Sequence, residues 1–142
     1  MEVEDLLRGT RLFQNLGKAE IELIARSTRL ETYKAGHIIV REGRVGAAFF
    51  IIVSGSVEVV KDIGGPSPTT LATFGPGEFF GEISTVKHLP RSASVRAVQD
   101  TDCLVIWRTD FDAFIRHFPE AAAKVEAAAR ARLADGQDLG VG

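Results

Sequence analysis

Residues 75–95 are the part of the chain whose residue types could do chemistry, and they read GPGEFFGEISTVKHLPRSASV. The segment combines glycines, a glutamate between apolar residues, and an arginine followed by small hydroxyl-bearing residues. A glycine lets a ligand approach the backbone closely, and a guanidinium can pair with two phosphate oxygens at once. The spacing therefore predicts a phosphate cradle, with Arg91 as its cation and Gly81 at its backbone wall.

The residues after Gly81 add detail to this cradle. We expect Gly81-Glu82-Ile83-Ser84 to form the first turn of a short helix, whose N–H groups point at an anion. Ser92 and the amide of Ala93 can add hydrogen bonds. The carboxylate of Glu82 would repel a phosphate unless it faced a donor, and a sugar hydroxyl is such a donor. Phosphate plus ribose is therefore the ligand chemistry that accounts for both charged residues.

Other phosphate and metal motifs are absent from the sequence. No Gly-Lys-Ser/Thr ends a P-loop, and Gly75-x-Gly77 followed by Gly81 is one residue too long for a dinucleotide fingerprint. The three histidines lack metal-ligand spacing, and no His-x-His occurs. These absences argue against a metal-dependent, cupin-like enzyme on a similar fold.

Phe80-Gly81-Glu82-Ile83 and then Pro90-Arg91-Ser92-Ala93-Ser94-Val95 resemble the phosphate-binding cassette of the cyclic nucleotide-binding domain family. That family includes bacterial cAMP-receptor transcription factors, protein kinase A regulatory subunits and cyclic-nucleotide-gated channels. The resemblance extends over about residues 10–133, through segments at 12–16, 36–39, 42–43, 50–52 and 55–57. The chain departs from many family members at residues 44–48, where Arg-Val-Gly-Ala-Ala replaces a Gly-Asp or second acidic residue.

The resemblance implies roles for individual residues. Arg91 would pair with the cyclic phosphate, and Glu82 would accept a hydrogen bond from the ribose 2′-hydroxyl. The implied ligand-binding set is Gly81, Glu82, Ile83, Ser84, Arg91, Ser92 and Ala93, and the possible lid residues over the base are Arg130, Arg132 and Leu133. The implied ligand is cAMP or cGMP, with cAMP favoured, and no catalytic residue, metal or further cofactor is expected.

The elements that must position these residues change type along the chain. A helix is expected over 18–28, where apolar residues recur at helical spacing. Between about 30 and 107, short apolar runs are separated by glycine-bearing breaks, which is typical of an antiparallel sandwich or barrel. The runs are at 37–40, 48–53, 56–60, 70–74, 93–98 and 102–107.

Helical periodicity returns after Trp107. Thr109-Asp110 is expected to cap a helix with an apolar stripe, and Pro119 suits the first turn of a second helix. The pattern therefore predicts a mainly β domain with an N-terminal helix and two C-terminal helices, and the resemblance implies that its β part is a jelly-roll-like antiparallel β-roll. Residues 1–135 are expected to form this one domain, and residues 136–142 a disordered tail.

Composition limits the function classes. The 142 residues include 17 basic and 19 acidic side chains, a net charge of −2, which argues against binding nucleic acid or an anionic membrane. The N-terminus has no secretory signal, no apolar run could span a bilayer, and the single cysteine fits a reducing compartment, so a cytoplasmic location is expected.

Together these features favour a non-enzymatic receptor domain for a cyclic nucleotide. Occupancy would be coupled to movement of the C-terminal helices, in the regulatory part of a larger protein such as an ion channel. The alternatives are a β-roll that has lost its ligand and acts as an interaction module, and the cupin-like enzyme disfavoured above. The sequence leaves the oligomeric state open.

Overall fold

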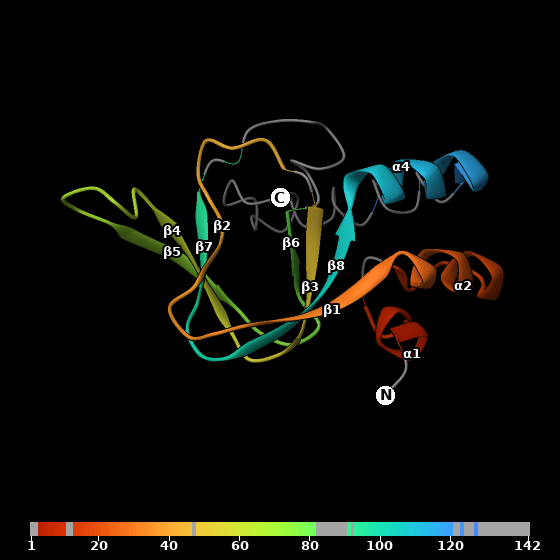
Figure 1. Ribbon diagram of the computed structural model, residues 1–142, viewed down its shortest axis with the longest axis horizontal. Coiled ribbons are helices and arrows are strands. Elements are labelled where there is room, and N and C mark those ends of the chain that lie inside the picture. The colour runs from red at the N-terminus through yellow and green to blue at the C-terminus, as the bar shows by residue number, and fades with distance from the viewer. Residues whose placement is uncertain are drawn as a thin grey trace.

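The computed structural model describes residues 3–10, 13–46, 48–81, 91, 93–120, 123 and 127. Eight strands form two four-stranded antiparallel sheets, in the orders β1-β8-β3-β6 and β2-β7-β4-β5, and the helices gather beside the first sheet (Figure 1). The elements are α1 (Val3–Arg8), α2 (Lys18–Arg26), β1 (Thr28–Tyr33), β2 (Ile38–Val40), β3 (Ala48–Ser54), β4 (Val57–Lys61), β5 (Thr69–Phe74), β6 (Phe79–Phe80), β7 (Ser94–Ala97), β8 (Thr101–Trp107) and α4 (Arg108–His117). The predicted β-roll with flanking helices is confirmed.

Strands β3 and β8 in the middle of the first sheet are buried on both faces, which explains their long apolar runs. Successive side chains of a strand point to opposite faces. In β3, Phe49 and Ile51 face the helices, whereas Phe50 and Ile52 face the second sheet. Strand β8 alternates in the same way and is paired in register with β3. Such a strand must be apolar at nearly every position.

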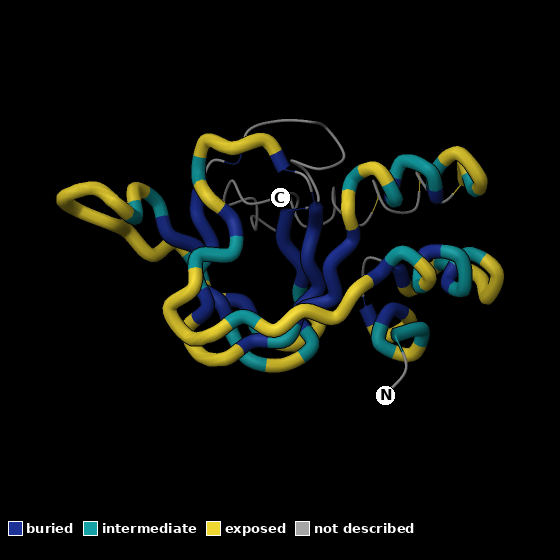
Figure 2. The backbone as a smooth tube through the Cα atoms, in the orientation of Figure 1, coloured by how far each residue is buried: buried dark blue, intermediate teal, exposed yellow. Residues whose placement is uncertain are grey.

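Two apolar cores result. The first lies between the helices and the outer face of the first sheet and contains Leu7, Ile24 and Phe111. The second lies between the two sheets and includes Phe50 and Phe80. The buried segments in Figure 2 follow these strands, whereas the loop of the β4–β5 hairpin is exposed.

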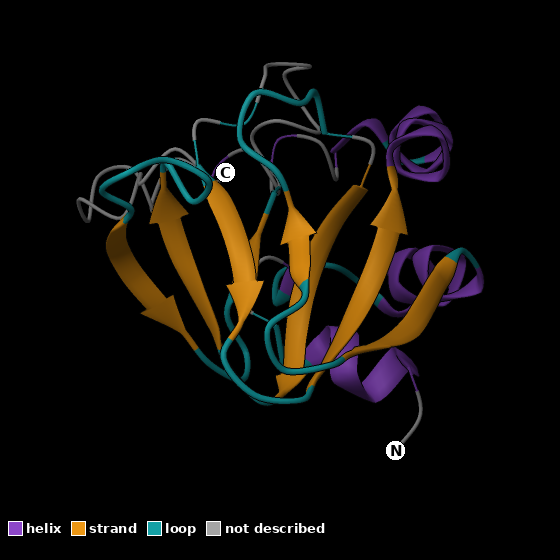
Figure 3. Cartoon of the chain, turned by 60° about the vertical axis from the view of Figure 1, so that its left-hand side comes forward, coloured by secondary structure: helices purple, strands orange, loops and turns teal. Residues whose placement is uncertain are grey.

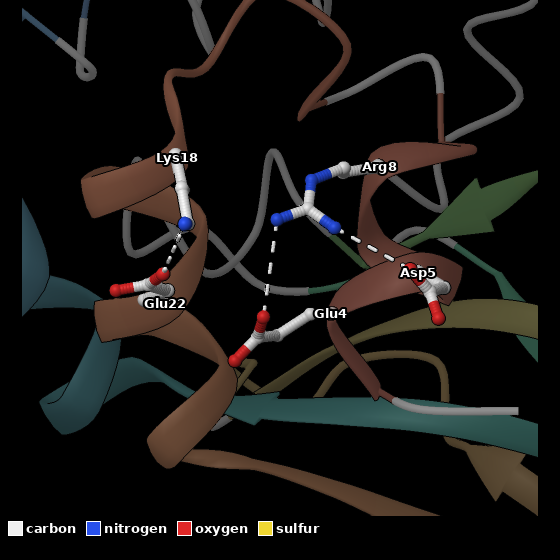
Figure 4. Close-up of polar contacts among 5 residues, drawn as sticks. All are labelled: Glu4, Asp5, Arg8, Lys18 and Glu22. Carbon is white, nitrogen blue, oxygen red and sulfur yellow. Dashed lines mark hydrogen bonds and ion pairs between the residues drawn. The ribbon is translucent and has the colours of Figure 1, made fainter.

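The helices are held by their apolar faces rather than by surface charge. Ile21 and Ile24 of α2 are each 1% exposed. The ion pairs of α1 and α2 lie on the surface: Arg8 to Glu4 at 3.8 Å, Arg8 to Asp5 at 3.4 Å, and Lys18 to Glu22 at 3.9 Å (Figure 4). Exposed pairs of this kind contribute about 0–1 kcal/mol.

Two strands and one helix start differ from the sequence prediction. Each predicted apolar run lies on a strand, but β1 and β6 were not predicted (Figure 3). The predicted cap at Thr109-Asp110 is wrong, because α4 already begins at Arg108 and its N-cap is Trp107, without a side-chain capping bond. The extended backbone of Trp107, the last residue of β8, leads directly into the helix.

The end of the chain is described only in part. Pro119 and Glu120 are helical, as are residues 123 and 127, in agreement with a second C-terminal helix starting at Pro119. The predicted tail, 136–142, lies outside the described residues. Within the described part of the chain, no helix has both the length and the apolar character needed to cross a membrane.

Candidate functional site

Arg91 is the buried cation of the predicted site, with 5% of its surface exposed. Its guanidinium Nη2–H donates a 2.7 Å hydrogen bond to the carbonyl of Ala48, the first residue of β3. Its backbone N–H donates to the carbonyl of Arg44 at 2.8 Å, and its own carbonyl accepts from the N–H of Gly43 at 2.7 Å. The connection between β2 and β3 therefore fixes the backbone of Arg91, and the start of β3 orients its side chain.

Gly81 lies directly against this guanidinium. A Cβ placed on Gly81 would lie 2.5 Å from Arg91 Nη1 and 3.2 Å from the Ala48 carbonyl oxygen. The backbone of Gly81 also has a φ of +88°, which residues with a side chain rarely adopt. The positive φ favours glycine at this position, and the fold brings positions 81 and 91 together.

The position of Gly81 is set by the strand before it. Phe80 is fully buried in the core between the sheets, and its ring stacks on Phe50 with the centroids 4.9 Å apart and the planes at 11°. Strand β6 also pairs with β3 in register, Phe50 opposite Phe80. The first residue of the predicted cradle is therefore anchored to the same strand whose Ala48 carbonyl orients Arg91.

Ala93 lies at the entry to β7 and is fully buried. The next residue, Ser94, accepts a 3.0 Å hydrogen bond at Oγ from the backbone N–H of Glu42. This bond is a second tie between the β2–β3 connection and the chain that follows Arg91. Residues 42–43 belong to the segments that resemble the family, and their types alone did not indicate this role.

Glu42 extends these ties to β4. Its carboxylate accepts a 3.0 Å hydrogen bond from the backbone N–H of Asp62 and lies 3.3 Å from the ammonium of Lys61. The hydrogen bond from the Asp62 N–H, with a smaller contribution from Lys61, holds the pKa of the Glu42 carboxyl below its ordinary value. The carboxylate is thus charged at neutral pH and fastens the β2–β3 connection to the end of β4.

Several predicted site residues lie outside the described part of the structure. They are Glu82, Ile83, Ser84 and Ser92 of the cradle, and Arg130, Arg132 and Leu133 of the possible lid. The described geometry therefore covers Gly81, Arg91 and Ala93.

The described residues offer nothing for metal or thiol chemistry. Among them, no group of three or more His, Cys, Asp or Glu side chains could hold a metal ion. Burial raises the pKa of the Cys103 thiol to about 12, so it stays protonated at neutral pH, whereas a nucleophilic or metal-binding cysteine must be a thiolate. Cys103 packs as a small apolar side chain in the core between the sheets.

Comparison with known proteins identifies the family. The sequence model of the cyclic nucleotide-binding domain matches residues 30–118, a range that contains both Gly81 and Arg91. The chain belongs to the cyclic nucleotide-binding domain family. The cyclic nucleotide-binding domain is a regulatory binding module, and the fold described above agrees with it.

Relatives of this domain occur in proteins of different kinds. The chain is 36% identical over 127 residues to the cyclic AMP receptor protein of Thermus thermophilus, covering 89% of this chain and 59% of that protein. It is 38% identical over 117 residues to a cyclic nucleotide-gated potassium channel of Mesorhizobium japonicum, covering 82% of this chain and 31% of the channel. The crystal structure of the Thermus thermophilus catabolite activator protein superposes with a TM-score of 0.77 at 35% identity, covering 89% of this chain and 60% of that one. The domain thus spans about a third to three-fifths of these relatives.

Proposed function

We propose that this domain binds a cyclic nucleotide, with its cyclic phosphate at Arg91 and Gly81. The observation that carries the proposal is the buried guanidinium of Arg91, oriented by the Ala48 carbonyl and lying against a glycine of positive φ. The hydrogen bond to the Ala48 carbonyl holds the guanidinium in one orientation. A planar, positively charged fork held in one orientation suits the oxygens of a phosphate.

The other site residues take the roles that the family implies. The amides of Gly81 and Ala93 donate to the phosphate, and Glu82 accepts from the ribose 2′-hydroxyl. Ile83, Ser84 and Ser92 complete the cradle. One of the lid residues Arg130, Arg132 and Leu133 covers the base. Support for this set comes from the family membership and from the closeness of Gly81 to Arg91.

The preferred base is adenine in this proposal, so the ligand is cAMP rather than cGMP. Support comes from the similarity to a protein named as a cyclic AMP receptor. Calorimetric titrations with cAMP, cGMP and linear 5′-AMP test the proposal together. We expect affinity in the order cAMP, cGMP, 5′-AMP, because the linear phosphate carries an extra charge and lacks the ring. Equal affinity for cAMP and 5′-AMP, or no binding of either cyclic nucleotide, would overturn it.

The domain further acts, in this proposal, as the cytosolic regulatory part of a larger protein, such as an ion channel. Support comes from its similarity to parts of longer proteins, one of them a cyclic nucleotide-gated channel. Binding would be coupled to movement of the C-terminal helices because the ligand favours one of their arrangements. Hydrogen exchange of residues 108–133 with and without cAMP tests this coupling. Protection outside the cradle is expected to change, and unchanged protection throughout these helices would contradict it.

A further inference from the structure

A cavity of about 380 Å³ opens between the two sheets on the side where β1 and β2 are the edge strands. Its walls are Tyr33 of β1, Val40 of β2, and the inward-facing Phe50 and Val105 of β3 and β8. No described residue of β4 or β5 lines this cavity. Among the described residues of the proposed nucleotide site, Arg91 alone lines it. A volume of this size lies within the range of about 300–1,000 Å³ that holds small organic ligands.

The lining of this cavity carries an excess of positive charge. Among the described lining residues, Arg41 and Arg44 from the connection after β2 accompany Arg91, and Glu31 is the one carboxylate. The side chains of Arg41 and Arg44 form no hydrogen bond or ion pair with other residues of the described chain, and both are exposed. This excess of guanidinium groups over carboxylates among the described lining residues favours an anion.

The mouth of the cavity is also apolar. Trp107 is 47% exposed and Val45 is 51% exposed, and both line the opening. An indole face and an aliphatic side chain at the surface stabilise an aromatic or aliphatic group that covers them. Tyr33 adds a phenol hydroxyl to the lining, and a phenol is a hydrogen-bond donor at neutral pH.

We propose that this cavity is a second binding site, for a small organic anion with an apolar body, separate from the nucleotide site. The apolar body lies against Trp107 and the strand side chains, and the anionic group lies between the guanidinium groups of Arg41 and Arg44. A hydrophobic monocarboxylate has this chemistry and this size.

The experiment uses the single tryptophan of the chain as a local reporter. Trp107 gives one indole N–H cross-peak in a ¹⁵N–¹H correlation spectrum, which can be followed while 4-phenylbutyrate is added at low ionic strength. The matched neutral probe is 4-phenylbutyramide, which has the same apolar body and no charge. We expect a saturable shift of the indole cross-peak, with tighter binding of the carboxylate than of the amide.

Charge variants assign the carboxylate to the guanidinium groups. In the double variant Arg41→Gln/Arg44→Gln, the affinity for 4-phenylbutyrate is expected to fall about tenfold, since both charge-assisted contacts are lost. The affinity for the amide should stay the same. Arg26→Gln, the same substitution on helix α2, is the matched control and should leave both affinities unchanged.

Three outcomes would overturn the proposal. They are the absence of a saturable shift with 4-phenylbutyrate, equal affinity for the carboxylate and the amide, and displacement of 4-phenylbutyrate by saturating cAMP. The last outcome would mean that the probe occupies the nucleotide site. A cAMP titration of wild type without 4-phenylbutyrate tests the proposed function separately.

Discussion

Replacing Gly81 by alanine tests why this position is a glycine. The new methyl group would lie 2.5 Å from Arg91 Nη1, closer than real Cβ contacts come, so the guanidinium must move. Moving it breaks the 2.7 Å hydrogen bond to the Ala48 carbonyl. Loss of a hydrogen bond to a charged group costs about 1.5–3 kcal/mol, and the positive φ costs a residue with a side chain about 1–2 kcal/mol more.

We therefore expect Gly81→Ala to lower the free energy of unfolding by about 2.5–5 kcal/mol, measured by urea denaturation. Gly77→Ala is the matched control, because Gly77 has a φ of +86° and a Cβ there would meet nothing within 4 Å. The free energy of unfolding of Gly77→Ala should fall only by the backbone contribution of about 1–2 kcal/mol. The affinity for cAMP should fall in Gly81→Ala and be retained in Gly77→Ala. Equal losses of stability and equal cAMP affinities in the two variants would refute the close approach of Arg91 to Gly81.

Two further predictions concern the core that positions the site. Phe80→Ala removes a fully buried ring stacked on Phe50, and should lower the free energy of unfolding by about 3–5 kcal/mol in urea denaturation; a loss below about 1 kcal/mol would contradict the packing described for β6. Cys103 has a pKa raised by burial to about 12, so between pH 9 and 10 the unfolded chain loses a proton that the folded chain keeps, and stability falls as the pH rises. Between pH 9 and 10, the free energy of unfolding should fall by about 1 kcal/mol more in wild type than in Cys103→Ala. If the free energy of unfolding has the same pH dependence in both proteins, the thiol is not buried as described.

Much of the fold could be predicted from the sequence because most strands are buried on one or both faces. Strand β3 is apolar throughout its central part, since Phe49 and Phe50 face different cores. Strand β1 escaped prediction for the opposite reason: it is an edge strand, and residues 29–32 are exposed, with a single apolar side chain among polar and charged ones. Strand β6 has two residues, Phe79 and Phe80, which is too short for any periodicity to be visible.

The candidate site could be predicted where its chemistry resides in side chains. The arginine at 91 and the glycine at 81 are visible in the sequence, and the fold places them in contact. The groups that hold Arg91 could not be predicted, because they are the backbone carbonyls of Arg44 and Ala48, and any residue carries a carbonyl. The departure from many family members at residues 44–48 thus includes two residues, Arg44 and Ala48, that hold Arg91 through their backbone carbonyls.

Calorimetric titration of cAMP into wild type and Arg91→Ala tests the central claim most directly. If Arg91 pairs with the cyclic phosphate, its removal should weaken binding by about 2–5 kcal/mol, a loss of about 30-fold or more, as is usual when one partner of a buried charge pair is deleted. Arg91→Lys should fall between the two, because it keeps the charge and loses the planar fork. Circular dichroism spectra of the variants should match wild type. A folded Arg91→Ala variant that binds cAMP as tightly as wild type would contradict the account.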